Sequence, residues 1–339
     1  MWDMTNHPAL LGVFDAWTET YSYRDIPDSL LNVGQYTTLW IGGVLVDDHK
    51  VVFVPFGNTG TGIHVGIFDV LANNLDTVDI TTLIPHSVGH DAGLFHSGVL
   101  ACDGTVVFVP NYGHQSIGIF EVNSRSFDTF DISAKNVKGG GYVGGVLLPS
   151  CKIVLVPGSS DNIGIFDPST NNFDIKDISS VLSGSRLFIR GVLTPGGHVI
   201  LSPHYDLTKG NPGYIGVFNP STEEFRVVDI SDKIQSGGSG GGYYGAVLLP
   251  NGNILHIPYS SGEIGIFNPS TESFHVEKWK SHGEVGFGGG TVTKNGKVVM
   301  SPLNGKIGVY DLADQDPLYT VEGGVPESWK VLLSPHLNT

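Results

Sequence analysis

Short apolar runs, separated by residues typical of turns, recur along the whole chain. The unit from Gly145 to Ser179 shows the pattern, with apolar runs of four to six residues at 145–148, 152–156, 163–166 and 173–178. Runs of this length that are rich in Val, Ile, Leu and Phe and lie between Gly, Pro, Asn and Asp are typical of β-strands joined by tight turns. Each unit therefore predicts four short strands, named A, B, C and D in chain order.

A glycine followed two residues later by an aromatic residue marks the C strand of each unit. Successive glycines are 43 to 54 residues apart. A repeat of this length is typical of propellers and solenoids, in which each unit packs on its neighbours. The pairs are Gly12 and Phe14, Gly66 and Phe68, Gly118 and Phe120, Gly164 and Phe166, Gly216 and Phe218, Gly265 and Phe267, and Gly308 and Tyr310.

The two ends of the chain carry parts of one further unit. Residues 8–26 contain only a C strand and a D strand, and residues 329–335 form an apolar run typical of a B strand. A sheet shared between the two ends would close the units into a ring, which removes open sheet edges. The sequence therefore predicts an all-β fold: a seven-bladed β-propeller with four-stranded antiparallel blades, in a single domain over 1–339. The split blade comes from 8–26 plus 323–339, and the whole blades lie near 40–80, 95–133, 142–179, 188–231, 243–279 and 287–322.

The repeat resembles those of a known group of propellers. Gly-Val-Leu, a glycine-containing turn, an apolar B strand and then Asn-Ile-Gly-Ile-Phe-Asp-Pro-Ser-Thr at 162–170 resemble repeats of the NHL, YVTN and virginiamycin B lyase-like β-propellers. The likeness covers essentially the whole chain and implies the fold, whereas propellers host many functions. No catalytic residue of the lyase can be matched to a position in this chain. A kelch-like double glycine is present, but at Gly144-Gly145 it precedes the first strand and does not follow the second.

The chain is acidic, because 18 Lys and Arg residues against 33 Asp and Glu residues give a net charge of −15 with His neutral. A nucleic-acid partner needs a basic surface, so none is expected. No apolar run approaches the ~20 residues of a membrane-spanning helix, so no membrane partner is expected. Residues 1–7 lack the basic and then apolar pattern of a signal peptide. Neutral or cationic partners fit the charge better, and the oligomeric state stays open.

Cys102 and Cys151 fall in the A-to-B turns of neighbouring units. In other units this turn carries Asp-Gly, Gly-Gly or Asn-Gly, which supply the positive φ angles of a hairpin. Cys151 takes the place of the glycine. Because the ends of neighbouring blades are expected to lie well apart, no disulfide is predicted. Free thiols and the missing signal sequence favour a cytoplasmic protein.

The connections between strands predict where a site would lie. In a propeller, the D-to-A and B-to-C loops share one face, and the A-to-B and C-to-D turns share the other. The turns of the second face are short and uniform, whereas the first face holds long and dissimilar loops at 81–96, 134–143, 204–214 and 231–244. Variable loops on a rigid frame usually carry function. A single ligand site is therefore predicted on the loop-rich face, at the mouth of the central channel.

An aromatic residue lies three places before the residue that starts each A strand, which is a glycine in all units but the one that has Ala246. Such rings at the channel mouth could stack on sugars or other flat ligands. The alternative is that they fill gaps between blades, which is favoured because a residue present in every repeat is usually architectural. The aromatic residues are Trp40, Phe95, Tyr142, Phe188, Tyr243 and Phe287.

Residues that break the repeat point more directly to function. Arg190 stands just before an A strand where other units have Gly or Ser, and His204 and Tyr259 follow the proline that ends strand B. His204 is predicted as a general base with Arg190 as the stabiliser of negative charge, and His282 and Glu284 are further catalytic candidates. The predicted ligand-binding residues are Trp40, His90, Asp91, His96, Tyr112, His114, Tyr142, Tyr205, Tyr243, Tyr244 and Tyr259. Each histidine taken singly is more often a surface or hydrogen-bonded residue.

Three functions remain open from the sequence. The first is a binding module for a small molecule, glycan or peptide, and the second is a lyase, isomerase or hydrolase that uses a His general base at the same site. The third is a protein-interaction scaffold that uses the rim. No cofactor is predicted. His86, His90 and Asp91 could hold a divalent metal, but their spacing matches no tight metal-binding motif.

Overall fold

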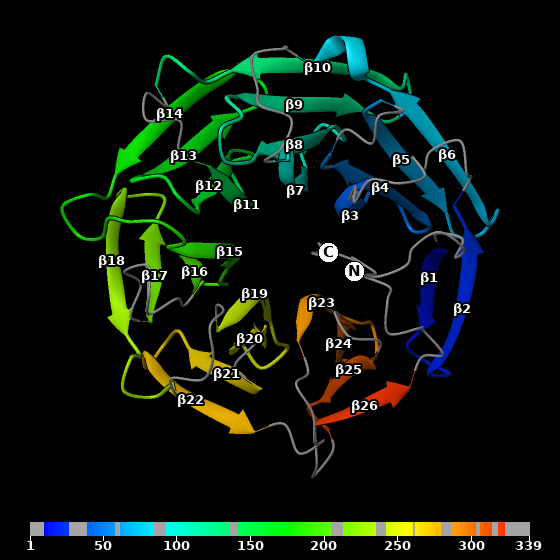
Figure 1. The fold of residues 1–339 in the computed structure, drawn as a ribbon. Coiled ribbons are helices and arrows are strands. Elements are labelled where there is room, and N and C mark those ends of the chain that lie inside the picture. The colour runs from blue at the N-terminus through cyan, green and yellow to red at the C-terminus, as the bar shows by residue number, and fades with distance from the viewer. Residues whose placement is uncertain are drawn as a thin grey trace, which may run out of the picture.

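The protein is an all-β propeller. The computed structural model describes residues 10–26, 39–57, 62–84, 93–135, 141–204, 213–234, 242–259, 262–278, 286–302, 306–313 and 318–322. Within them, six four-stranded antiparallel sheets stand around a central axis, and a two-stranded sheet lies beside the first and the last of them (Figure 1). In each four-stranded sheet the first strand is innermost and the fourth is outermost.

The strands follow one another in each sheet in chain order. The two-stranded sheet contains β1 (Leu10–Asp15) and β2 (Thr20–Asp25). The first two four-stranded sheets contain β3 (Trp40–Leu45), β4 (Lys50–Pro55), β5 (His64–Asp69) and β6 (Asn74–Asp79), and β7 (Phe95–Leu100), β8 (Val106–Pro110), β9 (Ser116–Glu121) and β10 (Ser126–Asp131). The next two contain β11 (Tyr142–Leu147), β12 (Ile153–Pro157), β13 (Asn162–Asp167) and β14 (Asn172–Asp177), and β15 (Phe188–Leu193), β16 (Val199–Pro203), β17 (Tyr214–Asn219) and β18 (Glu224–Asp229). The last two contain β19 (Tyr243–Leu248), β20 (Ile254–Pro258), β21 (Glu263–Asn268) and β22 (Ser273–Lys278), and β23 (Phe287–Val292), β24 (Lys297–Pro302), β25 (Lys306–Asp311) and β26 (Leu318–Glu322). A short 3-10 helix, η2 (Thr81–Leu83), follows β6.

The recurring glycine of strand C contacts the recurring aromatic residue at the start of strand A. A Cβ atom built on Gly118 in β9 would lie 2.9 Å from Cζ of Phe95 in β7, and one on Gly216 would lie 2.8 Å from Cζ of Phe188. The ring from strand A thus occupies the space that a side chain on strand C would need. Each such pair fixes the inner strand against its own sheet, which is why both residues recur.

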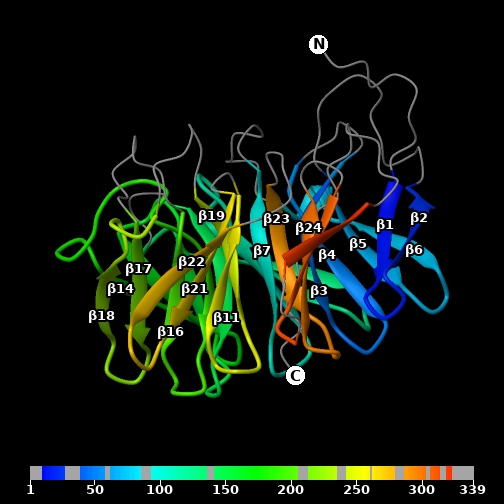
Figure 2. The same ribbon diagram turned by 90° about the horizontal axis from the view of Figure 1, so that it is seen from below.

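The short turns are uniform because one capping pattern repeats. In the turn after β13, the Asp167 carboxylate accepts a hydrogen bond of 3.0 Å from the backbone N–H of Ser169. Asn219 and Asn268 accept equivalent bonds of 2.9 Å in two other sheets. Side chains of this kind mimic a backbone turn and fix its shape. These turns lie together on one face of the disc, at the bottom in Figure 2.

A disulfide joins Cys102 to Cys151, so the prediction of free thiols is wrong. The two Cα atoms are 5.6 Å apart, within the range that a disulfide requires. The innermost strands β7 and β11 of neighbouring sheets run side by side near the axis, which brings their A-to-B turns together. Because disulfides persist mainly in oxidising compartments, the argument from free thiols for a cytoplasmic location no longer holds. In the part of the chain that the structure describes, no helix is long and apolar enough to cross a membrane.

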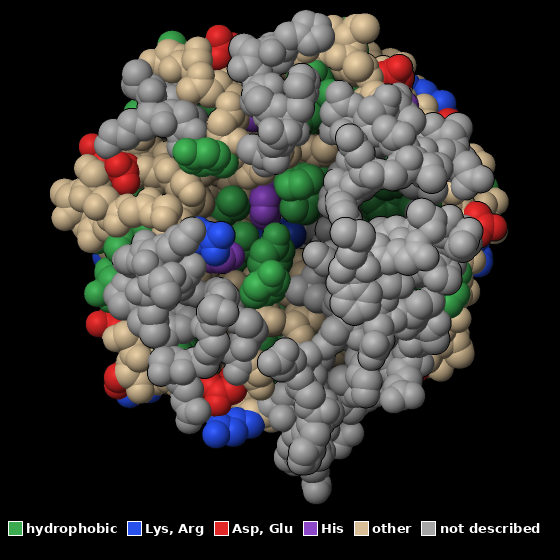
Figure 3. Space-filling model, viewed as in Figure 1, with side chains coloured by type: hydrophobic (Ala, Val, Ile, Leu, Met, Phe, Trp, Pro, Cys, Tyr) green, Lys and Arg blue, Asp and Glu red, His purple; other side chains and the backbone are tan. Residues whose placement is uncertain are grey.

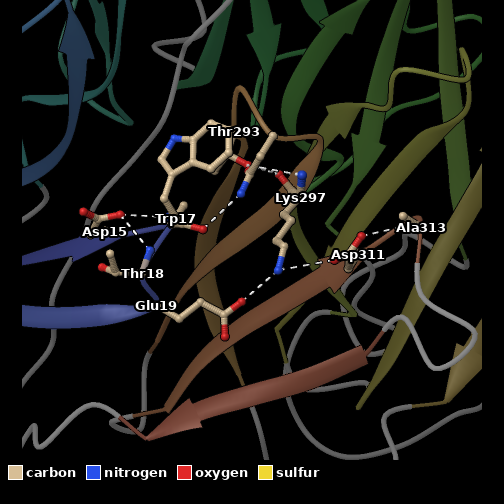
Figure 4. A network of polar contacts seen from close by, with 10 residues as sticks. Asp15, Trp17, Thr18, Glu19, Thr293, Lys297, Asp311 and Ala313 are labelled. Carbon is tan, nitrogen blue, oxygen red and sulfur yellow. Dashed lines mark hydrogen bonds and ion pairs between the residues drawn. The ribbon is translucent and has the colours of Figure 1, made fainter.

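The β1–β2 hairpin contacts both of the sheets that flank it in the ring. On one side, the Lys297 ammonium lies 2.8 Å from a carboxylate oxygen of Glu19 and 3.3 Å from one of Asp311 (Figure 4). On the other side, Leu11 packs in one buried cluster with Phe53 and Phe68 of the first four-stranded sheet. The hairpin thus bridges β3–β6 and β23–β26, whereas the predicted B strand at 329–335 lies outside the described residues.

Candidate functional site

Side chains from three sheets meet around Tyr244 at the channel. The Tyr244 ring stacks on Tyr259 with the ring centres 5.2 Å apart, and it lies edge-on to His204 at 6.2 Å. Its centre is 6.3 Å from that of His96, which comes from β7 on a sheet three places away around the ring. We call His96, Arg190, His204, Tyr244 and Tyr259 the channel cluster. Figure 3 shows histidine and hydrophobic side chains gathered at the central hollow of the loop-rich face.

Two residues of the channel cluster, His96 and Tyr244, lie where the strand pairing is irregular. The pairing of β7 with β8 shifts between Phe95 and Ser97, so His96 lies in a β-bulge. The pairing of β19 with β20 shifts between Tyr243 and Ala246, so Tyr244 also lies in a bulge. A bulge changes the direction of a side chain and is often found beside functional sites. The aromatic residue before each bulge enters the blade core, and the bulge residue faces the channel.

His96 is neutral at physiological pH. Its Nδ1 lies 3.0 Å from the Val143 carbonyl oxygen, and since a carbonyl can only accept, Nδ1 carries the proton. Nε2 is then an acceptor, 3.5 Å from the Tyr244 hydroxyl. Burial lowers the pKa of His96 to about 3, and the positive potential of Arg190 and His204 adds to this effect. The ring therefore offers a hydrogen-bond acceptor and no positive charge.

Arg190 is a cation almost enclosed by protein, with 6% of its surface exposed. A Cβ atom on Gly245 would lie 2.9 Å from Arg190 Cδ, and one on Gly144 would lie 3.1 Å from Arg190 Cα. Gly245 thus leaves room for this side chain, and Gly144 leaves room for the Arg190 backbone. Burial lowers the pKa of Arg190 and Tyr244 opposes the shift, but a guanidinium stays protonated in proteins.

The two tyrosines of the channel cluster lead from the interior to the surface. Burial raises the pKa of Tyr244, while the positive charge of Arg190 acts in the opposite direction. Tyr244 therefore keeps its proton and can donate a hydrogen bond. Tyr259 is 36% exposed and extends the aromatic surface outwards. The cluster combines a cation, a neutral acceptor, a hydroxyl donor and a flat ring in one place.

Several predicted ligand-binding residues belong to the core. Tyr142 and Tyr243 are fully buried, so their rings cannot meet a ligand at the channel mouth in this structure. Trp40 stacks on Phe53 at 5.1 Å and donates from its indole nitrogen to the His64 carbonyl at 2.8 Å. The architectural interpretation of the recurring aromatic residues therefore holds for these three, because they fill the blades.

The other predicted residues differ in their surroundings. His114 is buried edge-on to Phe95 with the ring centres 5.0 Å apart, and burial lowers its pKa to about 4. It packs in a blade and does not join the channel cluster. Tyr112 is 60% exposed on the loop after β8, and a Cβ atom on Gly141 would lie 2.3 Å from its backbone nitrogen. The predicted residues that lie outside the described ranges are His86, His90, Asp91, Tyr205, His282 and Glu284.

Two polar residues beneath the channel cluster were missed by the sequence interpretation. Ser202 pairs with Arg190 across β15 and β16, and its hydroxyl donates to the Gly245 carbonyl at 3.1 Å. His256 in β20 lies 2.8 Å from the same hydroxyl. A comparison of aligned strands could have found both, because the equivalent positions in other units are mostly apolar. Among the described residues, no group of three or more His, Cys, Asp or Glu side chains could hold a metal ion.

Comparison with known proteins places the fold. No protein-family model matches the chain, and no curated protein matches it in sequence. Solved structures with a similar fold include a streptogramin B lyase, at 13% identity and a TM-score of 0.66, over 88% of this chain and 87% of that one. Virginiamycin B lyase from Staphylococcus aureus gives 14% identity and a TM-score of 0.65, over 86% of each chain. YCF48 bound to a D1 peptide gives 14% and 0.57, over 84% of this chain and 81% of that one.

These structures define the class as a β-propeller whose structural neighbours are virginiamycin B lyase-like propellers. Identities of 13–14% show a shared fold and carry no activity over to this chain.

Proposed function

We propose that the protein binds a single small-molecule, glycan or peptide ligand at the channel mouth on the loop-rich face. The observation that carries this proposal is the burial of Arg190, 6% exposed, where its charge acts on the pKa values of Tyr244 and His96. A buried cation costs free energy that a fold without a use for it would avoid. Perturbed ionisable groups of this kind cluster at functional sites.

The chemistry of the channel cluster narrows the ligand. The planar guanidinium of Arg190 suits a carboxylate, a phosphate or a pair of acceptor oxygens. The stacked rings of Tyr244 and Tyr259 suit a flat body such as an aromatic ring or a sugar face. The part of the ligand that enters the channel therefore carries an acceptor or anionic group on a flat frame. His96 can accept one hydrogen bond from it.

One site is favoured over several equivalent ones. The position of Arg190 is held by glycine in four other units, at Gly42, Gly144, Gly245 and Gly289, and by Ser97 in a fifth. The charge therefore appears once among these units, and so does the Tyr244–Tyr259 stack. A repeated lectin-like arrangement would instead repeat its binding groups from blade to blade.

An enzymatic use of the same site is the alternative proposal. His204 lies beside Tyr244 and interacts electrostatically with His96, and the fold is shared with lyases. In this proposal, His204 removes a proton and Arg190 stabilises the negative charge that develops. His96 is poorly suited as the base, because a group with a pKa of about 3 binds a proton weakly near neutral pH. His282 and Glu284 remain candidates for this role.

The experiment compares ligand binding by the wild-type protein with binding by charge variants. Benzoate serves as the probe with a flat ring and an anionic group, and benzamide serves as its uncharged counterpart, each titrated by calorimetry. Arg190→Ala is expected to abolish benzoate binding while thermal stability changes little. Arg186→Ala removes an exposed cation four residues earlier and is the matched control. A large loss of stability in Arg190→Ala, or benzoate binding that survives it, would assign Arg190 to architecture.

We also propose that the whole chain is one seven-bladed domain. The β1–β2 hairpin supplies the two outer strands of the seventh blade, and residues 323–339 supply the inner ones. The support is the position of the hairpin between the first and last four-stranded sheets, fixed by Lys297 on one side and Leu11 on the other. A closed ring leaves no open sheet edge, which favours this arrangement.

A further inference from the structure

A second concave site lies on the face opposite the channel cluster. A cavity of about 290 Å³ opens among the short turns, between the sheet β15–β18 and the sheet β19–β22. Its floor is apolar and buried, formed by Ile200, Val217 and Phe267. Its edge is polar and includes Arg226, Glu272 and His198. The volume is just below the roughly 300–1,000 Å³ that small-molecule pockets occupy.

Between the neighbouring sheets β7–β10 and β11–β14, the place equivalent to this cavity is closed by the disulfide. In each A-to-B turn, the first residue donates its N–H to the carbonyl of the fifth, as in Ala101 to Thr105 and Thr194 to His198. By this numbering, Cys102 is the second residue of its turn and Cys151 the fourth of the next, and the disulfide joins them.

Between β15–β18 and β19–β22, the same two positions hold Pro195 and Gly252. A Cβ atom on Gly252 would have nothing within 4 Å. Both residues line the cavity, and neither has a side chain long enough to cross it. The cavity is thus open at the point where a covalent link closes its counterpart.

Two oppositely charged side chains lie at the edge of the cavity, and the ion pair between them is weak. Arg226 of β18 forms an ion pair with Glu272 of the neighbouring sheet, and their side chains are 52% and 41% exposed. An exposed pair of this kind contributes only about 0–1 kcal/mol, so a ligand can separate it. The turn that carries His198 is fixed, because the Thr194 hydroxyl donates to the His198 carbonyl at 3.0 Å and accepts from its N–H at 3.1 Å.

We propose that this cavity binds a small zwitterion, a free α-amino acid with an apolar side chain. The ligand's carboxylate takes the Arg226 guanidinium, its ammonium takes the Glu272 carboxylate, and its side chain covers Phe267 on the floor. Both charges of the ligand are needed, because each replaces one half of the existing ion pair. A simple anion would also face the repulsion of a chain with a net charge of −15.

The experiment uses L-leucine and L-phenylalanine as probes, followed by calorimetry and by NMR of the full chain. Saturable binding is expected for both amino acids. Isocaproate has the carboxylate alone and isoamylamine the amine alone, and each is expected to bind at least tenfold more weakly than leucine. Arg226→Gln and Glu272→Gln are each expected to weaken amino-acid binding by a similar factor. Absence of saturable binding by the wild-type protein overturns the proposal.

A blocking variant locates the binding. Ser270 is exposed at the edge of the cavity, and Ser270→Trp is expected to abolish amino-acid binding. Ser221→Trp places the same side chain in the equivalent turn of the neighbouring sheet, which does not line the cavity, and is expected to bind like the wild type. Unchanged binding in Ser270→Trp overturns the proposal. Arg190→Ala affects only the channel cluster, so amino-acid binding that survives in it separates this site from the one proposed above.

Discussion

The hydroxyl oxygen of Ser202 lies 2.8 Å from Nδ1 of His256, and this contact joins two neighbouring sheets inside the protein. Ser202 also donates to the Gly245 carbonyl, so the His256 nitrogen is the donor to Ser202. Burial lowers the pKa of His256 to about 3, so the ring is neutral. Through Gly245, which directly follows Tyr244, the link supports the bulge that presents Tyr244 to the channel.

The two residues replace apolar ones. His256 pairs with the C-strand glycine of its sheet, and the residues in this position of five other sheets are Phe53, Phe108, Leu155, Leu201 and Met300. Ser202 stands where three other units have Val54, Val109 and Val156. A polar pair in a place where the fold accepts Leu and Val indicates a role other than filling the core.

A double-mutant cycle tests whether the pair acts as a unit. Ser202→Val is expected to cost about 1–3 kcal/mol of unfolding free energy, because it leaves the His256 N–H buried without an acceptor. Adding His256→Leu should recover most of that loss, since apolar replacement of both partners is often nearly neutral. Urea unfolding of both single variants and the double variant gives the coupling energy. Ser301→Val, at the equivalent position of β24, should show no coupling with His256→Leu, and additive effects of Ser202 and His256 would contradict the link.

The buried histidines predict a stability that falls in mild acid. The pKa of His256 is about 3 in the folded protein, against about 6.5 when unfolded. Between these two pH values the unfolded chain binds one more proton at this histidine than the folded protein does. The free energy of unfolding therefore rises with pH in this range, and the contribution of the histidine is lost as the pH falls from about 6.5. Each such histidine contributes a slope of about 1.4 kcal/mol per pH unit. His96 acts in the same direction.

Unfolding measured between pH ~5 and ~6, above the range in which carboxyl groups titrate, checks this slope. The Ser202→Val, His256→Leu double variant should show a slope smaller by about one proton than the wild type. His275→Leu removes an exposed histidine of β22 and is the matched control. Equal slopes in the wild type and the double variant would show that His256 is not neutral in the folded state.

The sequence predicted the blades well because the residues that define each blade lie within a single repeat. Each unit carries its own turn residues, and the glycine of strand C leaves space for the ring of strand A, as Gly118 does for Phe95. The same reasoning put Arg190, His204 and Tyr259 on one face, and the structure brings them together around Tyr244. Their function stays a prediction.

Relations between blades could not be predicted in the same way. The disulfide between Cys102 and Cys151 depends on how closely the inner strands of two sheets approach, which no single repeat encodes. The same holds for Tyr244 and His96, which meet across the channel from sheets 148 residues apart in sequence. The sequence also could not decide between two roles for a residue such as Tyr142. A ring that fills a blade and a ring that binds a ligand have the same sequence signal.

The disulfide predicts a measurable loss of stability on reduction. A bond between residues 49 apart should contribute about 2–4 kcal/mol by restricting the unfolded chain. Wild-type protein should therefore unfold at lower urea concentration in the presence of reductant. The Cys102→Ala, Cys151→Gly double variant should unfold alike with and without reductant. Its glycine also suits the positive φ of 64° at this position, which offsets part of the loss. Two reactive thiols in unreduced wild-type protein would contradict the bond.

Closure of the ring predicts that the last residues of the chain support its first hairpin. Deletion of 323–339 should lower Tm by roughly 10 °C or more, because several kcal/mol correspond to such a shift in a chain of this size. The loss should be greatest around β1 and β2, which hydrogen exchange can measure at Leu11 and Tyr23. Deletion of 1–7, which precedes the hairpin, is the matched control and should leave Tm nearly unchanged. A synthetic peptide of 323–339 added to the shortened protein should restore Tm. An unchanged Tm after deletion of 323–339 would show that the seventh blade is not completed by this segment.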